Sequence, residues 1–228
     1  MTFDLRAASY EQFERFVFDH PPPTEGAGAV DWFWDALDKA MDDEESYEPP
    51  ACVPALQVAH LTRLFRDASH LATVYAPEQL CQGFWLLFGA AGGELFQEPM
   101  YDPQVPWEAR ATCFSTLVDL YEGLFAAVWC GDAAYMLFDG LICGHFGYPH
   151  PGRRLDAEDL RTRDHIFGVL QRILVVPEES CQRGALHGLG HLMHPGTAEV
   201  VDCFLATGKA VNADIAKYAS AAKTGDIQ

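Results

Sequence analysis

The sequence predicts an all-α protein with a single domain. Alanine and leucine account for 53 of the 228 residues, whereas valine and isoleucine account for only 19, and alanine and leucine are the better helix formers. Apolar residues recur with the 3.6-residue period of a helix along most of the chain. Proline and glycine stand in the short intervals between these stretches, as they do between antiparallel helices.

Two runs of proline, at positions 21–23 and 49–50, divide the N-terminal part of the chain. Proline stops a helix because it lacks the amide hydrogen and clashes with the preceding turn. Between the two runs the sequence predicts one short helix over residues 30–41. We expect residues 1–50 to form an acidic, aromatic-containing helical segment that packs on a helical-repeat body, residues 51–228.

Helix-start signals set most of the boundaries in the body. Pro77, Pro106 and Pro177 each stand where a helix begins, and proline is well tolerated in the first helical turn. Asp156 fits an N-cap, with Asp159 in the first turn that follows. The predicted helices cover residues 53–65, 78–88, a stretch from Pro106 to 128, 133–142, a stretch from Asp156 to 174, 178–193, 197–206 and 210–222.

One pair of segments indicates a repeat. Pro-Glu-Gln-Leu-Cys-Gln at 77–82 and Pro-Glu-Glu-Ser-Cys-Gln at 177–182 share four residues at the same spacing. Each begins a helix, as expected if antiparallel helical hairpins are stacked and each buries its face on the next. The predicted fold class is therefore an all-α, HEAT/armadillo-like α-solenoid of stacked antiparallel helical hairpins. The alternative is that two similar helix starts arose by chance.

The charge of the chain excludes some partners and favours another. The 33 acidic and 15 basic side chains give a formal net charge of −18, so we expect no nucleic-acid partner and no membrane partner. Residues 1–50 hold 13 of the acids and only 3 of the bases. Aromatic side chains within an acidic surface suit a cationic protein partner. The expected contacts are Trp32, Trp34, Asp42, Asp43, Glu44 and Glu45.

The cysteines and the N-terminus predict a cytoplasmic protein. The seven cysteines include no Cys-x-x-Cys pair, and most fall within apolar helical patterns, which predicts reduced, buried thiols. The first residues show no basic-then-apolar signal region. The longest apolar runs are far shorter than the roughly 18 residues that a membrane span needs.

One segment suggests metal chemistry. On a helix, His187, His191 and His194 share one face because they are spaced i, i+4 and i+7. Two imidazoles at i, i+4 can bind one zinc ion, and a third ligand completes a site. The metalloprotease pattern needs a glutamate directly after the first histidine, where this chain has Gly188. The alternative is that the glycines here permit close helix packing and the histidines bond to neighbouring carbonyl groups.

Other functional motifs are missing or incomplete. The chain contains no Gly-x-Ser-x-Gly element. Thr-Gly-Lys-Ala at 207–210 lacks the leading glycine and the final hydroxyl residue of a phosphate-binding loop. His145, His150 and His165 form a loose second group, which is more typical of packed connectors than of a site. We therefore expect no catalytic residues and no cofactor, and the protein is not expected to be an enzyme.

Five short elements together resemble an uncharacterised family of bacterial helical-repeat proteins. They are Phe-Val-Phe-Asp-His-Pro at 16–21, Trp-Phe-Trp at 32–34, Gln-Gly-Phe-Trp at 82–85, Cys-Gln at 181–182 and Leu-His-Gly-Leu-Gly-His at 186–191. The last of these is the most specific. The resemblance implies an accessory or immunity-type protein whose gene is associated with polymorphic toxins.

The leading functional hypothesis is a protein-binding, HEAT-like protein. Its specific form is an immunity protein that binds a cationic toxin domain and occludes the active site, because opposite charge speeds association. The first alternative is a metal-dependent enzyme that uses His187, His191 and His194. The second is a scaffold or regulator without any connection to a toxin.

Overall fold

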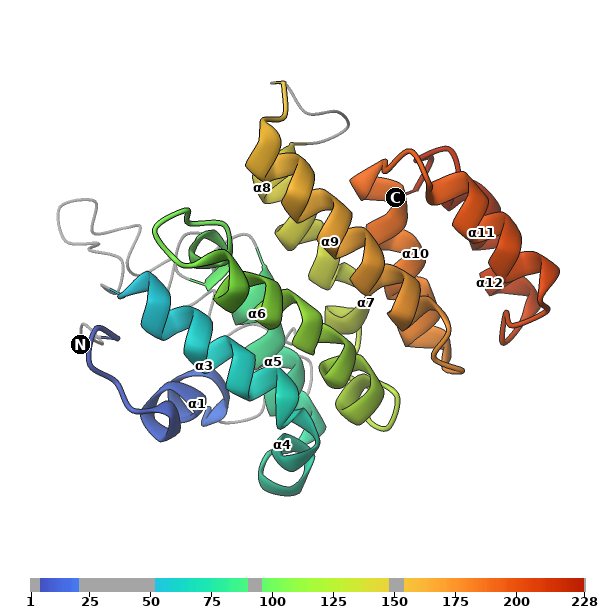
Figure 1. Cartoon of the computed structure of the whole chain (residues 1–228). Coiled ribbons are helices and arrows are strands. Elements are labelled where there is room, and N and C mark those ends of the chain that lie inside the picture. The colour runs from blue at the N-terminus through green and yellow to red at the C-terminus, as the bar shows by residue number, and fades with distance from the viewer. Residues whose placement is uncertain (1–4, 21–51, 90–95, 148–153, 228) are drawn as a thin grey trace, which may run out of the picture.

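A computed structural model describes residues 5–20, 52–89, 96–147 and 154–227 (Figure 1). These residues form helices and no strands, which confirms the all-α prediction. The main helices are α1 (Tyr10–Phe18), α3 (Pro54–Arg66), α4 (Ala68–Val74), α5 (Pro77–Phe88), α6 (Trp107–Leu120), α7 (Ala133–Phe138), α9 (Ala157–Leu174), α10 (Glu179–Leu192), α11 (Thr197–Ala206) and α12 (Ala213–Ala222). Within the described ranges, no helix combines the length and apolar character that crossing a bilayer requires.

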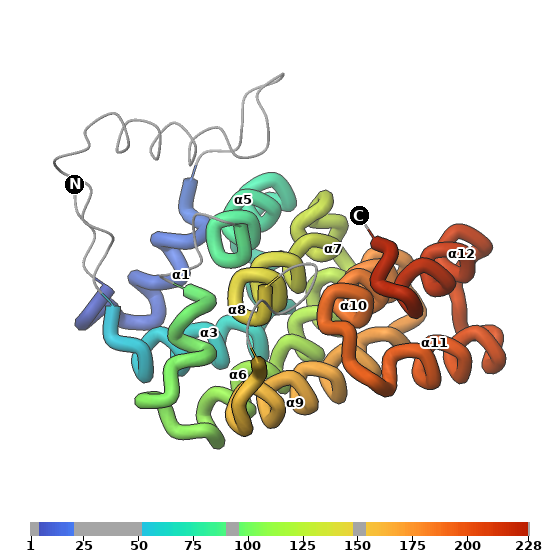
Figure 2. Tube along the Cα trace, turned by 90° about the horizontal axis from the view of Figure 1, so that it is seen from above, coloured from blue at the N-terminus to red at the C-terminus, as the bar shows by residue number. Residues whose placement is uncertain are grey.

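The helices lie in two rows. Figure 2 shows α3, α6, α9 and α11 along one side of the molecule and α5, α7, α10 and α12 along the other. Within the first row α3 packs on α6 and α6 on α9, and within the second α7 packs on α5 and α10. The pairs α9–α10 and α11–α12 join the rows. The apolar core therefore lies between the rows, where large side chains such as Phe114, Tyr121 and Phe138 are fully buried.

Several boundaries follow the predicted signals. Helix α5 begins at Pro77, and α11 covers the predicted residues 197–206. Asp156 caps α9, because its Oδ1 accepts hydrogen bonds from the backbone N–H groups of Glu158 and Asp159, each at 2.9 Å. The Asp159 carboxylate in turn accepts from the Asp156 N–H at 3.1 Å, which completes a capping box.

Two predicted helices are interrupted by wider turns. The stretch from Pro106 to 128 divides into α6 and the π-helical turn η4 (Tyr121–Phe125). The stretch 133–142 divides into α7 and the π-helical turn η5 (Asp139–Cys143), after which α8 (Gly144–Phe146) follows. A π turn contains one residue more than an α turn and shifts the apolar period, but each π turn here is followed by too short a helical stretch for periodicity to reveal the shift.

Helix α10 approaches α7 closely because it carries glycine at the contact. A Cβ atom at Gly184 would lie 2.7 Å from the backbone oxygen of Ala134, and one at Gly188 would lie 2.9 Å from the Phe138 ring. These distances are too short for a real side chain, so the spacing of the helices depends on the glycines. The close-packing interpretation of this glycine-rich segment is thus supported.

A buried amide holds the segment that precedes the C-terminal helix α12 against α10. The Gln182 side chain is fully buried; its Nε2 donates to the Lys209 carbonyl at 2.9 Å, and its Oε1 accepts from the Val211 N–H at 3.0 Å. Asn212 then caps α12 by accepting from the Ile215 N–H at 2.8 Å. The start of α12 is therefore fixed on α10, and one face of α12 lies against α10.

The described N-terminal residues pack on the body. Helix α1 contacts α3 and α5, and the Phe13 ring stacks on His60 with 5.2 Å between ring centroids. The predicted helix over 30–41 lies outside the described residues. So do the six predicted partner contacts, which are Trp32, Trp34, Asp42, Asp43, Glu44 and Glu45.

Candidate metal centre

Asp139, His187 and His191 come together where η5 meets α10. The Asp139 Oδ1 atom lies 2.9 Å from His191 Nε2 and 3.5 Å from His187 Nε2. The two Nε2 atoms are 3.0 Å apart. The imidazoles are nearly buried, with 1% and 6% of their side-chain surfaces exposed, whereas the Asp139 side chain is 36% exposed. The three groups thus form a cluster that is accessible to solvent from the side of the carboxylate.

Local backbone structure positions each group. His187 and His191 are one helical turn apart on α10, so their rings project from the same face. Asp139 is the first residue of η5, directly after α7. Because Gly184 and Gly188 allow α10 to lie against α7, the two imidazoles reach the residue at which α7 widens into the π turn.

The charge state of Asp139 suits metal binding. The adjacent imidazoles of His187 and His191 hold the pKa of the Asp139 carboxyl well below its usual range. Desolvation by partial burial opposes this shift and is the smaller effect. The group is therefore a carboxylate at neutral pH, the form in which Asp binds a metal ion.

The spacing of the three atoms fits one metal ion. A transition metal binds imidazole nitrogen and carboxylate oxygen at about 2.0–2.2 Å, which places neighbouring ligand atoms roughly 2.8–3.6 Å apart at octahedral or tetrahedral angles. The observed separations of 2.9, 3.0 and 3.5 Å fall close to that range. A donor set of two imidazoles and one carboxylate is typical of zinc sites and of non-haem Fe²⁺ sites with open positions.

A second layer of side chains surrounds the cluster. His187 Nδ1 lies 2.7 Å from the Tyr218 hydroxyl of α12, which lies 3.1 Å from the Tyr135 hydroxyl of α7. Burial is the main cause that raises the pKa of Tyr218 well above its usual value, so the hydroxyl keeps its proton. Such partners on the outer nitrogen are usual for metal-binding histidines.

Cys143 belongs to this outer layer. Its Sγ donates a weak hydrogen bond to Asp139 Oδ1 over 3.5 Å. Burial raises the pKa of the Cys143 thiol to about 12. Cys143 is not among the residues whose ligand atoms lie within 4.8 Å of one another, so it orients the carboxylate rather than completing the ligand set.

His194 does not join the cluster, although the sequence pattern places it on the same helical face. Helix α10 ends at Leu192, and Met193 adopts the left-handed conformation with φ 46°. His194 consequently turns away: its ring stacks on Phe167 at 3.8 Å, and its Nε2 lies 3.1 Å from Asp164 Oδ1. The structure thus brings together His187 and His191, with Asp139 in place of the third imidazole.

Asp139 is the site residue that sequence reasoning missed. The residue lies 48 positions before His187, inside a stretch predicted to be an uninterrupted helix. Nothing in the pattern distinguishes it from the other acidic residues of the chain, which number 33 in all with Asp139 included. Only the packing of α7 against α10 selects it.

The two described members of the second histidine group, His145 and His165, have different partners. His145 Nε2 lies 3.0 Å from the Asp159 carboxylate, and its ring stacks on Tyr101 at 3.8 Å. His165 instead bonds to the Ala111 carbonyl at 2.9 Å and contacts the Ser115 hydroxyl at 3.0 Å. His150 lies outside the described residues.

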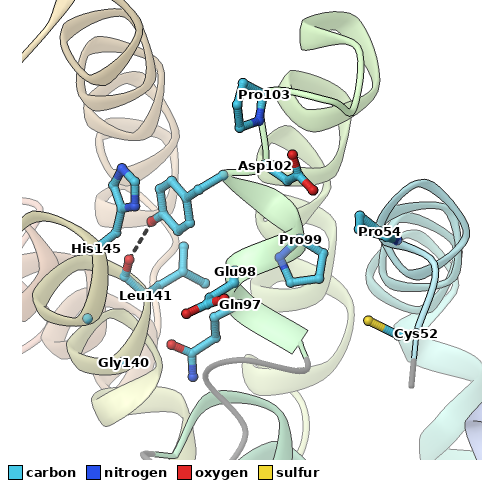
Figure 3. A pocket seen from close by; sticks show the side chains of 12 residues that line it. Cys52, Pro54, Gln97, Glu98, Pro99, Asp102, Pro103, Gly140, Leu141 and His145 are labelled. Atoms are coloured by element: carbon cyan, nitrogen blue, oxygen red, sulfur yellow. Dashed lines mark hydrogen bonds between the residues drawn. The ribbon is translucent and has the colours of Figure 1, made fainter. Parts of the chain in front are cut away.

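A cavity of about 520 Å³ lies beside His145 (Figure 3). Tyr101 donates a hydrogen bond to the Leu141 carbonyl at its wall, and the carboxylates of Glu98 and Asp102 face the same space. Asp139, His187 and His191 are not among the residues that line it. The cavity is therefore separate from the candidate metal centre.

Fold and site together define an all-α protein with a candidate mononuclear metal centre of two histidines and one aspartate. No protein-family model, curated protein or solved structure matches this chain. The function therefore has to follow from the residues and contacts described above.

Proposed function

We propose that the protein binds one divalent transition-metal ion, Zn²⁺ or Fe²⁺, through Asp139, His187 and His191. The observation that carries this proposal is the convergence of one carboxylate oxygen and two imidazole nitrogens within 4.8 Å of one another. The two Nε2 atoms lie 3.0 Å apart and face the same carboxylate oxygen, so one cation can bind all three atoms when the Nε2 lone pairs are free of hydrogen.

The centre is suited to metal-assisted chemistry. Three protein ligands leave at least one coordination position for water or a small oxygen-donor substrate, and the exposed side of Asp139 provides the approach. A metal ion bound here lowers the pKa of water and polarises carbonyl or phosphoryl groups. A metal-dependent enzyme is thus the function that the geometry supports best.

The test is metal binding by untagged protein that has been stripped with a chelator. We expect saturable binding of one Zn²⁺ per chain by calorimetry, and a visible absorption band when Co²⁺ replaces it. At a free metal concentration 100 times Kd, the free energy of unfolding should rise by about 2.7 kcal/mol. Absence of one-to-one binding for Zn²⁺, Fe²⁺ and Co²⁺ alike would contradict the proposal.

A second candidate function is protein binding, and one exposed side chain favours it. The Trp129 side chain, between η4 and α7, is 79% exposed, and tryptophan is the residue most enriched at the centres of protein interfaces. Together with the net charge of −18, it supports a protein that binds a cationic partner, and we propose that this protein is cytoplasmic. The resemblance of residues 186–191 to immunity-type proteins makes a toxin domain the partner to test first.

This second proposal includes the finer architecture. We propose that the two rows of helices are built from HEAT-like hairpins, of which α9–α10 and α11–α12 are examples. The row arrangement in Figure 2 supports this interpretation. In a solenoid of this kind each hairpin contacts its neighbours, and a continuous surface is available to a partner.

Association kinetics with a cationic toxin domain test the second proposal. Substituting serine for Asp42, Asp43, Glu44 and Glu45 together should slow association and weaken its dependence on salt. Trp129→Ala should weaken binding about 30-fold if it is an interface anchor. Leu160→Ala, which also removes an exposed apolar side chain, is the control. Unchanged kinetics in both variants would exclude these two surfaces.

A further inference from the structure

The proton position on His187 decides whether this residue can bind a metal. A neutral imidazole carries one hydrogen, on either Nδ1 or Nε2. The His187 Nε2 atom faces Asp139 and His191, and its Nδ1 faces the Tyr218 hydroxyl at 2.7 Å. A metal ion needs the lone pair on Nε2, so the hydrogen must be on Nδ1 and must have an acceptor there.

Without such an acceptor the wrong tautomer is favoured. A hydrogen on Nε2 would point towards the Asp139 carboxylate, 3.5 Å away, and would have that carboxylate as its acceptor. Because His187 is buried, an N–H group on Nδ1 without a partner carries a desolvation penalty. The equilibrium between the two tautomers is therefore set by what stands next to Nδ1.

Tyr218 is held in place for this role from two sides. Its hydroxyl lies 3.1 Å from the Tyr135 hydroxyl. A tyrosine oxygen both donates and accepts, so Tyr218 can accept from His187 Nδ1–H while donating to Tyr135. The Arg183 guanidinium lies over the Tyr218 ring at 5.4 Å, a cation–π contact that restrains the ring.

Tyr218 also links the centre to the C-terminal helix. It projects from α12, whereas the three proposed ligands belong to η5 and α10. On either side of α12, the Lys209 carbonyl bonds to the Gln182 amide of α10, and Ile227 packs where Gly190 has no side chain. One hydrogen bond, between Tyr218 and His187, thus links α12 to the proposed metal centre.

On these grounds we infer that Tyr218 is a positioning residue of the metal centre, which holds His187 in its metal-binding tautomer and couples metal binding to the docking of α12. The inference rests on the proposed metal-binding function. By linkage, the coupling acts in both directions: docked α12 strengthens metal binding, and bound metal holds α12 in place.

The first test is the variant Tyr218→Phe, which removes the hydroxyl and keeps the ring. We expect its affinity for Zn²⁺ and Co²⁺ to fall on the order of 10–100-fold, as for other outer partners of metal-binding histidines. In the metal-free protein, ¹⁵N chemical shifts of the His187 ring should move from the Nδ1–H form towards the Nε2–H form. Tyr75→Phe, whose hydroxyl bonds instead to Glu14 at 3.2 Å, should change neither quantity.

The second test is amide hydrogen exchange in α12. Zn²⁺ should slow exchange of the α12 amides in the wild-type protein and should have less effect in Tyr218→Phe. If the wild type binds metal and the variant binds equally well with an unchanged His187 tautomer, this inference is overturned and the proposed function stands. If the wild type binds no metal, both are overturned. Equal exchange with and without metal refutes the coupling to α12.

Discussion

Asp139→Ala is expected to remove high-affinity metal binding while the protein remains folded. The carboxylate is the only oxygen donor in the three-residue cluster, and its partly exposed position means that its loss leaves no buried apolar cavity. Loss of an outer partner of a ligand typically lowers affinity roughly 10–100-fold, so loss of a ligand itself should cost more. His191→Ala should have a comparable effect. Calorimetric titration with Zn²⁺ and absorption spectroscopy with Co²⁺ measure it.

His194→Ala is the matched control for this prediction. It removes the third imidazole of the sequence pattern, but that ring contacts Phe167 and Asp164 away from the cluster. We expect unchanged affinity and stoichiometry. The control also reports on the seven cysteines of the chain, since adventitious binding to thiols would persist in all three variants. Equal binding by Asp139→Ala and the wild type would show that the cluster is not the metal site.

Gly184→Ala is expected to destabilise the fold and to weaken the metal centre with it. The added methyl group would lie 2.7 Å from the Ala134 backbone oxygen and 3.0 Å from the Tyr121 hydroxyl, and a backbone atom within a helix cannot move aside alone. Overpacking of this kind costs about 1–3 kcal/mol. Because α10 must shift away from α7, His187 and His191 move away from Asp139, and the affinity for Zn²⁺ should fall as well.

Gly168→Ala, in the neighbouring helix α9, is expected not to destabilise the fold. Residue 168 lies within α9, and a Cβ atom there would have no other atom within 4 Å. Alanine is the better helix former by about 1 kcal/mol, so this variant should be as stable as the wild type or more so. Urea unfolding of Gly184→Ala and Gly168→Ala measures the free energy of unfolding of each variant. A stable Gly184→Ala protein with unaltered metal binding would refute the close-contact explanation.

The sequence predicted the helices well where side-chain pattern and local capping act together. Asp156 and Pro77 mark helix starts through their own chemistry, so α9 and α5 begin as expected. Residues 197–206 form a helix with the predicted ends because glycine precedes it and the apolar pattern stops there. These signals depend only on residues close to each other in the chain, so a single sequence is enough to recognise them.

The candidate site was predicted only in part, because it depends on contacts between distant segments. His187 and His191 are one turn apart, so their common face follows from the helix alone. The end of α10 depends on the left-handed conformation of Met193, which is not a residue that favours it. The approach of Asp139 depends on the packing of α7 against α10. Neither feature leaves a periodic signal.

The π turn at Asp139 has a consequence for how the surroundings of this cluster can change. Deleting a single residue from η5 after Asp139 would restore the ordinary α-helical path, and each residue of an α-helix turns the chain by about 100°. Asp139 is the first residue of η5, so α7 sets its direction and the deletion would leave that direction unchanged, whereas the residues after the deletion would face other neighbours. Within one helical scaffold, a one-codon insertion or deletion is thus sufficient to exchange the side chains around the carboxylate while the carboxylate itself stays in place.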